Sequence, residues 1–201
     1  MVRSDVQRIA GWIGLAAAGL FGLGSLLWWP WGELRPGATP VAIAEFYSQN
    51  PVRILIGGGV SVIALVLFVI FGAAVRQLVP ESRKLTGDIA LAGVVVTTVA
   101  GLAAETINMG GALRAANDPA LAQAMYEIPQ VFGGYTSAVG VGIFALAVAA
   151  SSLLPRWSAV LVGATGIVLL SPAALFIVEV AGAAFVLVSA LVATQLLTTE
   201  G

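Results

Sequence analysis

The chain has 201 residues, of which 59% are hydrophobic and only 9% charged, and its mean hydropathy is +1.01. A soluble domain carries roughly 25% charged residues, so this composition excludes a soluble globular fold and favours the lipid bilayer as solvent. The net charge of −1 argues against nucleic-acid binding, and the absence of cysteine and histidine excludes disulfides, Cys or His metal sites and His-based triads.

The first predicted transmembrane helix covers residues 9–29. Arg3 and Arg8 precede this apolar stretch, as basic residues precede the apolar part of a signal peptide. The stretch is, however, ~20 residues long, which is the length of a bilayer-crossing helix. It also ends in the tryptophan-rich segment 28–31 rather than in a small-residue cleavage motif. We therefore interpret it as a retained span.

Three further apolar segments long enough to cross a bilayer lie at residues 54–75, 89–109 and 131–153. The last apolar region is too long for one helix, and Ser171-Pro172 interrupts it. Proline lacks an amide donor and disfavours helix in the preceding residue, which predicts spans at 158–170 and 173–197. One kinked helix with an interfacial segment is the alternative. Residues 1–201 are thus predicted to form a single all-α transmembrane domain, a helical bundle of about six spans.

Both termini are predicted on the cytoplasmic side, the N-in/C-in orientation. Cytoplasmic loops of membrane proteins are enriched in lysine and arginine. With six spans, one side of the membrane receives most of the basic residues, and we assign that side to the cytoplasm. The larger group is Arg3, Arg8, Arg76, Arg83, Lys84 and Arg156, and the smaller group is Arg35, Arg53 and Arg114.

Two loops on the predicted outer side resemble each other. One contains Thr39-Pro40 and continues to Tyr47, and the other contains Asp118-Pro119 and continues to Tyr126. An N-cap residue followed by proline at the first helical position is a strong signal for a helix start. Each loop is therefore predicted to hold a short outer interfacial helix.

Small residues recur at a spacing of four, as in Gly57/Ser61 and Thr136/Gly140. Such pairs allow helix backbones to approach closely in lipid. Packing within one chain is the simpler interpretation, and a homo-oligomer interface is the alternative.

A few polar residues lie within the predicted spans. An ionisable side chain at the centre of a bilayer costs about 3 kcal/mol or more, so Glu105 and Glu179 each need an explanation. Thr98, Glu105 and Asn108 fall on one helical face. In the predicted topology both glutamates lie in the outer half of the membrane, and Arg53 enters its span from the same side.

We therefore expect Arg53, Thr98, Glu105, Asn108 and Glu179 to form a polar cluster that opens outward. Tyr47, Tyr126 and Arg114 are candidates to cover it. Three interpretations stay open. The cluster can be a buried ion pair that fixes helix packing, a pocket for a small polar or lipid head-group ligand, or a carboxylate that binds protons.

Three short motifs resemble a family of six-span bacterial membrane proteins, common in actinobacteria, that has no assigned activity. They are Arg8-Ile9-Ala10-Gly11, the Asp118-Pro119 loop and the segment 153–157, Leu-Leu-Pro-Arg-Trp. The resemblance implies a multi-pass protein of the bacterial plasma membrane. It implies no catalytic residue.

The sequence favours a non-enzymatic binding or accessory subunit of a membrane assembly, in contact with lipid and with other subunits or copies of itself. The alternative is a small carrier or a lipid or small-molecule receptor that uses the outward-facing cluster. A membrane enzyme is the least favoured class, because carboxylates would have to act without histidine or cysteine. No cofactor and no metal site is predicted.

Overall fold

The computed structural model describes the backbone of residues 3–28, 34, 37–171 and 178–198, without the side chains of residues 3 and 178–181. All the regular secondary structure in these residues is helical, which confirms the all-α prediction. In chain order the elements are α1 (Arg3–Trp28), α2 (Pro40–Gln49), α3 (Pro51–Leu78), η1 (Glu81–Arg83), α4 (Lys84–Arg114), α5 (Pro119–Pro129), η2 (Gln130–Thr136), α6 (Ser137–Ala150), α7 (Arg156–Leu170) and α8 (Val178–Thr198).

Within the described residues, four helical stretches are long and apolar enough to cross a membrane. They are Ser4–Trp28, Pro51–Leu78, Glu81–Arg114 and Pro119–Ala150, and the apolar helices α7 and α8 are shorter. The second and third enclose the predicted spans 54–75 and 89–109 and extend beyond them, and the first contains residues 9–28 of the predicted span 9–29, whose last residue lies outside the described residues. The helical hydrogen-bond ladder does not need apolar side chains, so a helix continues past the hydrocarbon layer into its polar flanks.

Helices α2 and α5 begin as the capping pattern predicts. The Thr39 hydroxyl accepts a hydrogen bond from the Ala42 amide at 3.3 Å, and the Asp118 carboxylate accepts one from the Leu121 amide at 3.0 Å. Each cap is followed by proline at the first helical position. Each cap therefore satisfies an amide at the helix start that has no partner inside the helix.

The fourth predicted span differs from the expectation. The sequence suggests a separate outer helix and a new helix from residue 131, whereas α5 runs into the π-helical turn η2 and then into α6 without a loop. Pro129 removes one amide donor from this continuous helix, and a wider turn can absorb such a break in register. The Ser137 hydroxyl donates to the Phe132 carbonyl, five residues back, at 3.2 Å.

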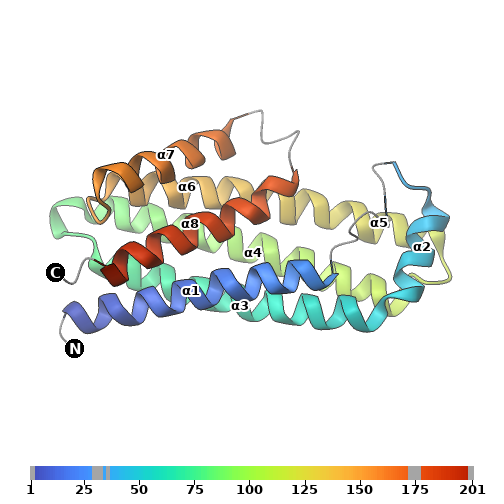
Figure 1. Ribbon diagram of the computed structural model, residues 1–201. Coiled ribbons are helices and arrows are strands. Elements are labelled where there is room, and N and C mark those ends of the chain that lie inside the picture. The colour runs from blue at the N-terminus through green and yellow to red at the C-terminus, as the bar shows by residue number, and fades with distance from the viewer. Residues whose placement is uncertain (1–2, 29–33, 35–36, 172–177, 199–201) are drawn as a thin grey trace.

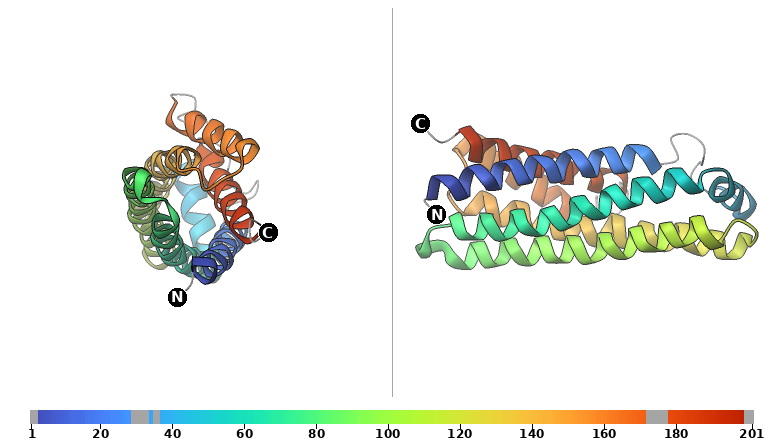
Figure 2. Two further views of the ribbon diagram at one scale, coloured as in Figure 1. Left: turned by 90° about the vertical axis from the view of Figure 1, so that its left-hand side faces the viewer. Right: turned by 90° about the horizontal axis from the view of Figure 1, so that it is seen from below.

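Five helices form a closed ring, in the order α1, α3, α4, α6 and α8 (Figures 1 and 2). Helix α7 lies outside the ring against α6, and α2 packs on α5 at one end. The start of α1 and the end of α8 lie together at the opposite end (Figure 1). Ser171, just before Pro172, is extended and ends α7, and α8 is a separate helix beside it.

Pairs of glycines bring neighbouring helices of the ring into backbone contact. A methyl group at Gly57 of α3 would lie 2.9 Å from the Gly24 carbonyl oxygen of α1. A methyl group at Gly93 of α4 would lie 2.6 Å from the Gly140 carbonyl oxygen of α6. Neither carbonyl can move aside without shifting its helix, so these crossings set the positions of four helices in the ring.

We predict that Gly93→Ala destabilises the protein by about 1 to 3 kcal/mol, because the added methyl group overpacks the crossing of α4 and α6. The measurement is thermal or denaturant unfolding in detergent, followed by tryptophan fluorescence. Gly59→Ala is the matched control, because a methyl group at this helical glycine meets no atom within 4 Å. Equal stability of the two variants would contradict the close crossing.

Candidate functional site

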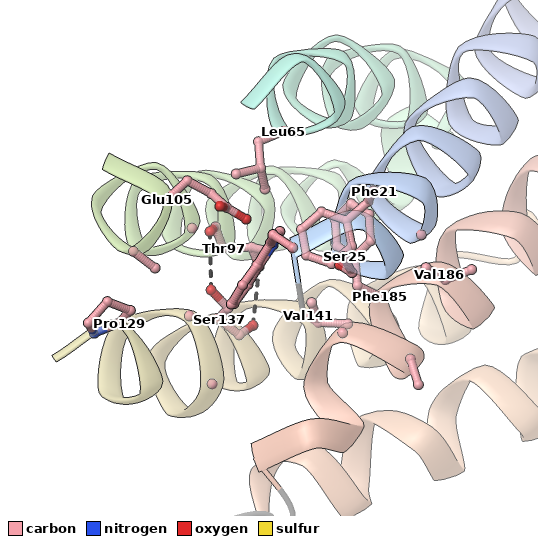
Figure 3. A pocket seen from close by; sticks show the side chains of 18 of the residues that line it. Phe21, Ser25, Leu65, Thr97, Glu105, Pro129, Ser137, Val141, Phe185 and Val186 are labelled. Atoms are coloured by element: carbon pink, nitrogen blue, oxygen red, sulfur yellow. Dashed lines mark hydrogen bonds between the residues drawn. The ribbon is translucent and has the colours of Figure 1, made fainter. Parts of the chain in front are cut away.

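A cavity of about 420 Å³ lies inside the ring, in the half of the bundle nearest α2 and α5. Helices α1, α4, α6 and α8 contribute most of its wall, together with the π-helical turn η2 (Figure 3). Much of the wall is apolar, and its large apolar side chains are Phe21, Leu26, Leu65, Val141, Phe185 and Val186.

Glu105 is the one ionisable side chain among the described residues that line this cavity. It is only 5% exposed, and its Oε2 atom has no hydrogen-bond partner among the described residues. The Ser61 hydroxyl and the Trp28 indole face the carboxyl group, but neither forms a well-shaped hydrogen bond with Oε2. A buried acceptor without a partner is costly, which marks this position as a place where a ligand group can be bound.

Helix α4 supplies the polar face of the cavity through Thr97, Gly101, Glu105 and Asn108. The sequence pattern selected Thr98 in place of Thr97. Thr98 is buried but does not line the cavity, and its hydroxyl has no hydrogen-bond partner among the described residues. The two threonines differ by about 100° around the helix, and both fit a helical spacing with Glu105.

Tyr47 of α2 covers the end of the cavity at Asn108. It is 2% exposed, and its hydroxyl lies 3.3 Å from Asn108 Oδ1 and 3.1 Å from the Met125 carbonyl oxygen, so its proton can serve either acceptor. Gly111 makes room for this ring, because a methyl group there would lie 2.7 Å from the Tyr47 ring. Tyr47 thereby connects α2 with α4 and α5.

The other predicted cover residues lie around this end without lining the cavity. Tyr126 is half-buried and packs against the apolar cluster that includes Tyr47. Arg114 is exposed at the last position of α4.

Arg53 and Glu179 are not placed in the cavity wall by the described contacts. Arg53 Nε donates to the Leu27 carbonyl oxygen at 2.6 Å, and a second nitrogen donates to Asn50 Oδ1 at 3.3 Å. Arg53 therefore binds a free carbonyl near the end of α1. Glu179 lies in α8, but its side chain is outside the described part. Of the predicted cluster residues whose side chains the structure describes, Glu105 and Asn108 line the cavity.

Several cavity residues were not foreseen from the sequence. The Thr97 hydroxyl can donate to the Gly93 carbonyl oxygen of its own helix at 3.0 Å or to the Ser137 carbonyl oxygen at 3.4 Å. The Ser137 hydroxyl can likewise donate to the Phe132 carbonyl oxygen at 3.2 Å or to the Thr97 carbonyl oxygen at 3.4 Å (Figure 3). The longer alternative of each hydroxyl links α4 to the start of α6. Gln130 and Trp28 also line the cavity. Ser137 and Gln130 depend on the π-helical turn, for which the sequence carries no signal.

The chemistry available here is binding through one carboxyl group. Within the described residues, no group of three acidic side chains is placed to hold a metal ion. The serine and threonine hydroxyls near Glu105 have no histidine to activate them, because the chain contains none. The site combines an apolar wall with one acidic hydrogen-bonding group, as small-molecule sites do.

Length and hydropathy of the helices make this chain a multi-pass, all-α membrane protein whose outer faces contact lipid. Comparison with protein-family models, with curated proteins and with solved structures found no match for the chain. The resemblance to the six-span bacterial family stays a prediction.

We predict that Tyr47→Phe destabilises the protein by about 1 to 2 kcal/mol, because it removes the buried hydroxyl that serves Asn108 and Met125. Unfolding in detergent at neutral pH measures the loss. An unchanged unfolding midpoint would show that α2 is not held by this hydroxyl.

The same residue predicts a pH dependence. Burial, and secondarily the neighbouring Tyr126, raise the pKa of Tyr47 above its usual value. The neutral hydroxyl therefore persists in the folded state while the unfolded chain ionises, so stability is full below about pH 10 and falls above it. Unfolding midpoints measured between pH 8 and pH 11 should decline more for the natural protein than for Tyr47→Phe. Parallel declines would contradict the assignment.

Proposed function

We propose that this protein binds a small, largely apolar molecule within its bundle, as a receptor or carrier for that molecule. The observation that carries the proposal is the cavity of about 420 Å³ with the unpartnered Glu105 carboxyl in its wall. Ligand pockets commonly measure roughly 300 to 1,000 Å³ and combine apolar walls with a few polar groups.

The space is not a general consequence of loose helix packing. Directly beside it, α1 and α3 are in backbone contact at Gly24 and Gly57, and a methyl group at Gly58 would lie 3.3 Å from Glu105 Oε2. The cavity is therefore a local opening in a tightly packed ring. A role as an accessory subunit of a membrane assembly stays a prediction that the cavity neither requires nor opposes.

We further propose six spans with both termini in the cytoplasm of a bacterium, so that α2 and α5 face the outside of the plasma membrane. The positions of α1 and α8 support this, because the start of one and the end of the other lie together (Figure 1). The basic residues Arg76, Arg83 and Lys84 lie toward this same end, where α3 ends and α4 begins.

This orientation predicts the labelling of single cysteines, which needs no background correction because the chain has none. Asn117→Cys, in the exposed turn before α5, should react with a membrane-impermeant maleimide added to intact cells. Ser82→Cys, exposed between α3 and α4, should react only after the cells are permeabilised. The reverse pattern would overturn the orientation.

The binding proposal predicts saturable labelling of the cavity by an uncharged photoreactive probe. We would use an alkyl alcohol with a diazirine in its chain, on the full chain in phosphatidylcholine vesicles, with adducts located by peptide mass spectrometry. Adducts on the cavity segments of α1, α4 and α8 should saturate and should be displaced by the same alcohol without the diazirine.

A pair of α1 variants tests whether the cavity itself is labelled. Gly22 lines the cavity, and a methyl group there meets only Val186 at 3.8 Å, so there is room for the first carbon of a larger side chain. Gly22→Leu should therefore occupy part of the cavity and reduce saturable labelling about tenfold. Gly19→Leu is the control, because Gly19 is exposed and has open space around it. Labelling that does not saturate, or saturable labelling that is equally strong in Gly22→Leu and in the natural protein, would overturn the proposal.

A further inference from the structure

The carboxyl group of Glu105 constrains the chemical type of the ligand, whereas the volume of the cavity constrains only its size. Its Oε2 atom is buried and forms no well-shaped hydrogen bond with the described residues, although the Ser61 hydroxyl and the Trp28 indole lie near it. A group that completes this site must therefore bring a hydrogen-bond donor. This inference rests on the proposed function, since it concerns the ligand of the same cavity.

The groups around Glu105 are neutral. They are the Ser61 hydroxyl on α3, the Trp28 indole on α1 and, one turn along α4, the Asn108 side chain. Asn108 Oδ1 is itself within reach of the Tyr47 hydroxyl. None of these groups can cancel the charge of an ionised carboxylate.

No arginine or lysine of the described chain lines the cavity. Arg53 is the basic residue nearest in the predicted topology, and it binds the Leu27 carbonyl and Asn50 instead. An isolated carboxylate in an apolar interior is strongly unfavourable, and a cation that it can hydrogen-bond offsets part of that cost. The arrangement therefore favours a ligand that is positively charged and disfavours one that is anionic.

The rest of the wall suits a hydrocarbon body. Phe21, Val141 and Phe185 line the space between α1, α6 and α8. Along α4 the cavity reaches from Asn108 to Thr97, which the helical rise places ~16 Å apart. Trp28 also lines the cavity near Glu105.

We propose that the cavity binds a lipophilic amine, with its protonated amino group at the Glu105 carboxyl and its hydrocarbon part between α1, α6 and α8. The ammonium group donates to Oε2 and supplies the positive charge that the wall lacks. Ser61, Trp28 and Asn108 complete a polar end around it, and the apolar side chains exclude water from the remainder.

The test compares three probes that share one diazirine-bearing alkyl chain and end in an amine, an alcohol or a carboxylic acid. The full chain is used in phosphatidylcholine vesicles at neutral pH, where the amine is charged and the lipid has no net charge. In the natural protein the amine should saturate the cavity at a concentration at least tenfold below that of the alcohol. The acid should not saturate it.

Glu105→Gln should remove the preference for the amine and keep the labelling by the alcohol, since the amide preserves the shape of the side chain. Glu127→Gln is the control, because Glu127 is exposed and hydrogen-bonded to Gln123 on the surface of α5. It should retain the preference in full. A tenfold loss corresponds to about 1.4 kcal/mol of binding free energy.

The outcomes separate this inference from the binding proposal. Saturable labelling with equal affinity for amine and alcohol, or with preference for the acid, overturns the amine inference and leaves the cavity as a binding site. Labelling by none of the probes overturns both. The three head groups compared on the natural protein decide the question even if Glu105→Gln fails to fold. A preference for the amine that survives Glu105→Gln also overturns the inference.

Discussion

The contact between the backbones of α4 and α6 is the constraint on which much of this structure depends. At Gly93 and Gly140 no side chain separates the two helices, and one turn further the Thr97 and Ser137 hydroxyls each lie 3.4 Å from a carbonyl oxygen of the other helix. Lipid tails are as apolar as the side chains, so no hydrophobic effect drives helices together inside a membrane. Packing contacts and interhelical hydrogen bonds must hold them together instead. This seam positions the α4 face that carries Glu105.

The cavity exists because the tight crossings do not extend across the interior of the ring. Helices α1 and α3 meet at Gly24 and Gly57, and α4 and α6 meet at Gly93 and Gly140. Between these two seams the wall is completed by η2 and α8, and a space of about 420 Å³ remains. The close helix crossings on both sides of the cavity hold its walls apart. A binding site that is already formed before its ligand arrives needs such support.

Glu105 is buried, and its Oε2 atom has no hydrogen-bond partner among the described residues. Positions that break a rule of protein packing in this way are often functional. The surrounding polar groups have partners where the fold can supply them: Tyr47 with Asn108, and Thr97 with Ser137. The π-helical turn adds to this picture, because such turns occur frequently at functional sites and this one places Gln130 and Ser137 in the cavity wall. Binding of a cationic head group would supply the partner that Glu105 Oε2 lacks among the described residues.

The sequence by itself determined the all-α class, the membrane character, the capped starts at Thr39 and Asp118, and the polar face through Glu105 and Asn108. These follow from local physics, since hydropathy, capping and helical spacing act over a few neighbouring residues. Only the tertiary structure decided that Thr97 rather than Thr98 faces the cavity, that Arg53 binds the Leu27 carbonyl, and that α5 continues into α6. Both threonines fit a helical spacing with Glu105, and an arginine side chain can reach several partners. Contacts with the neighbouring helices therefore determine which threonine faces the cavity and which carbonyl Arg53 binds.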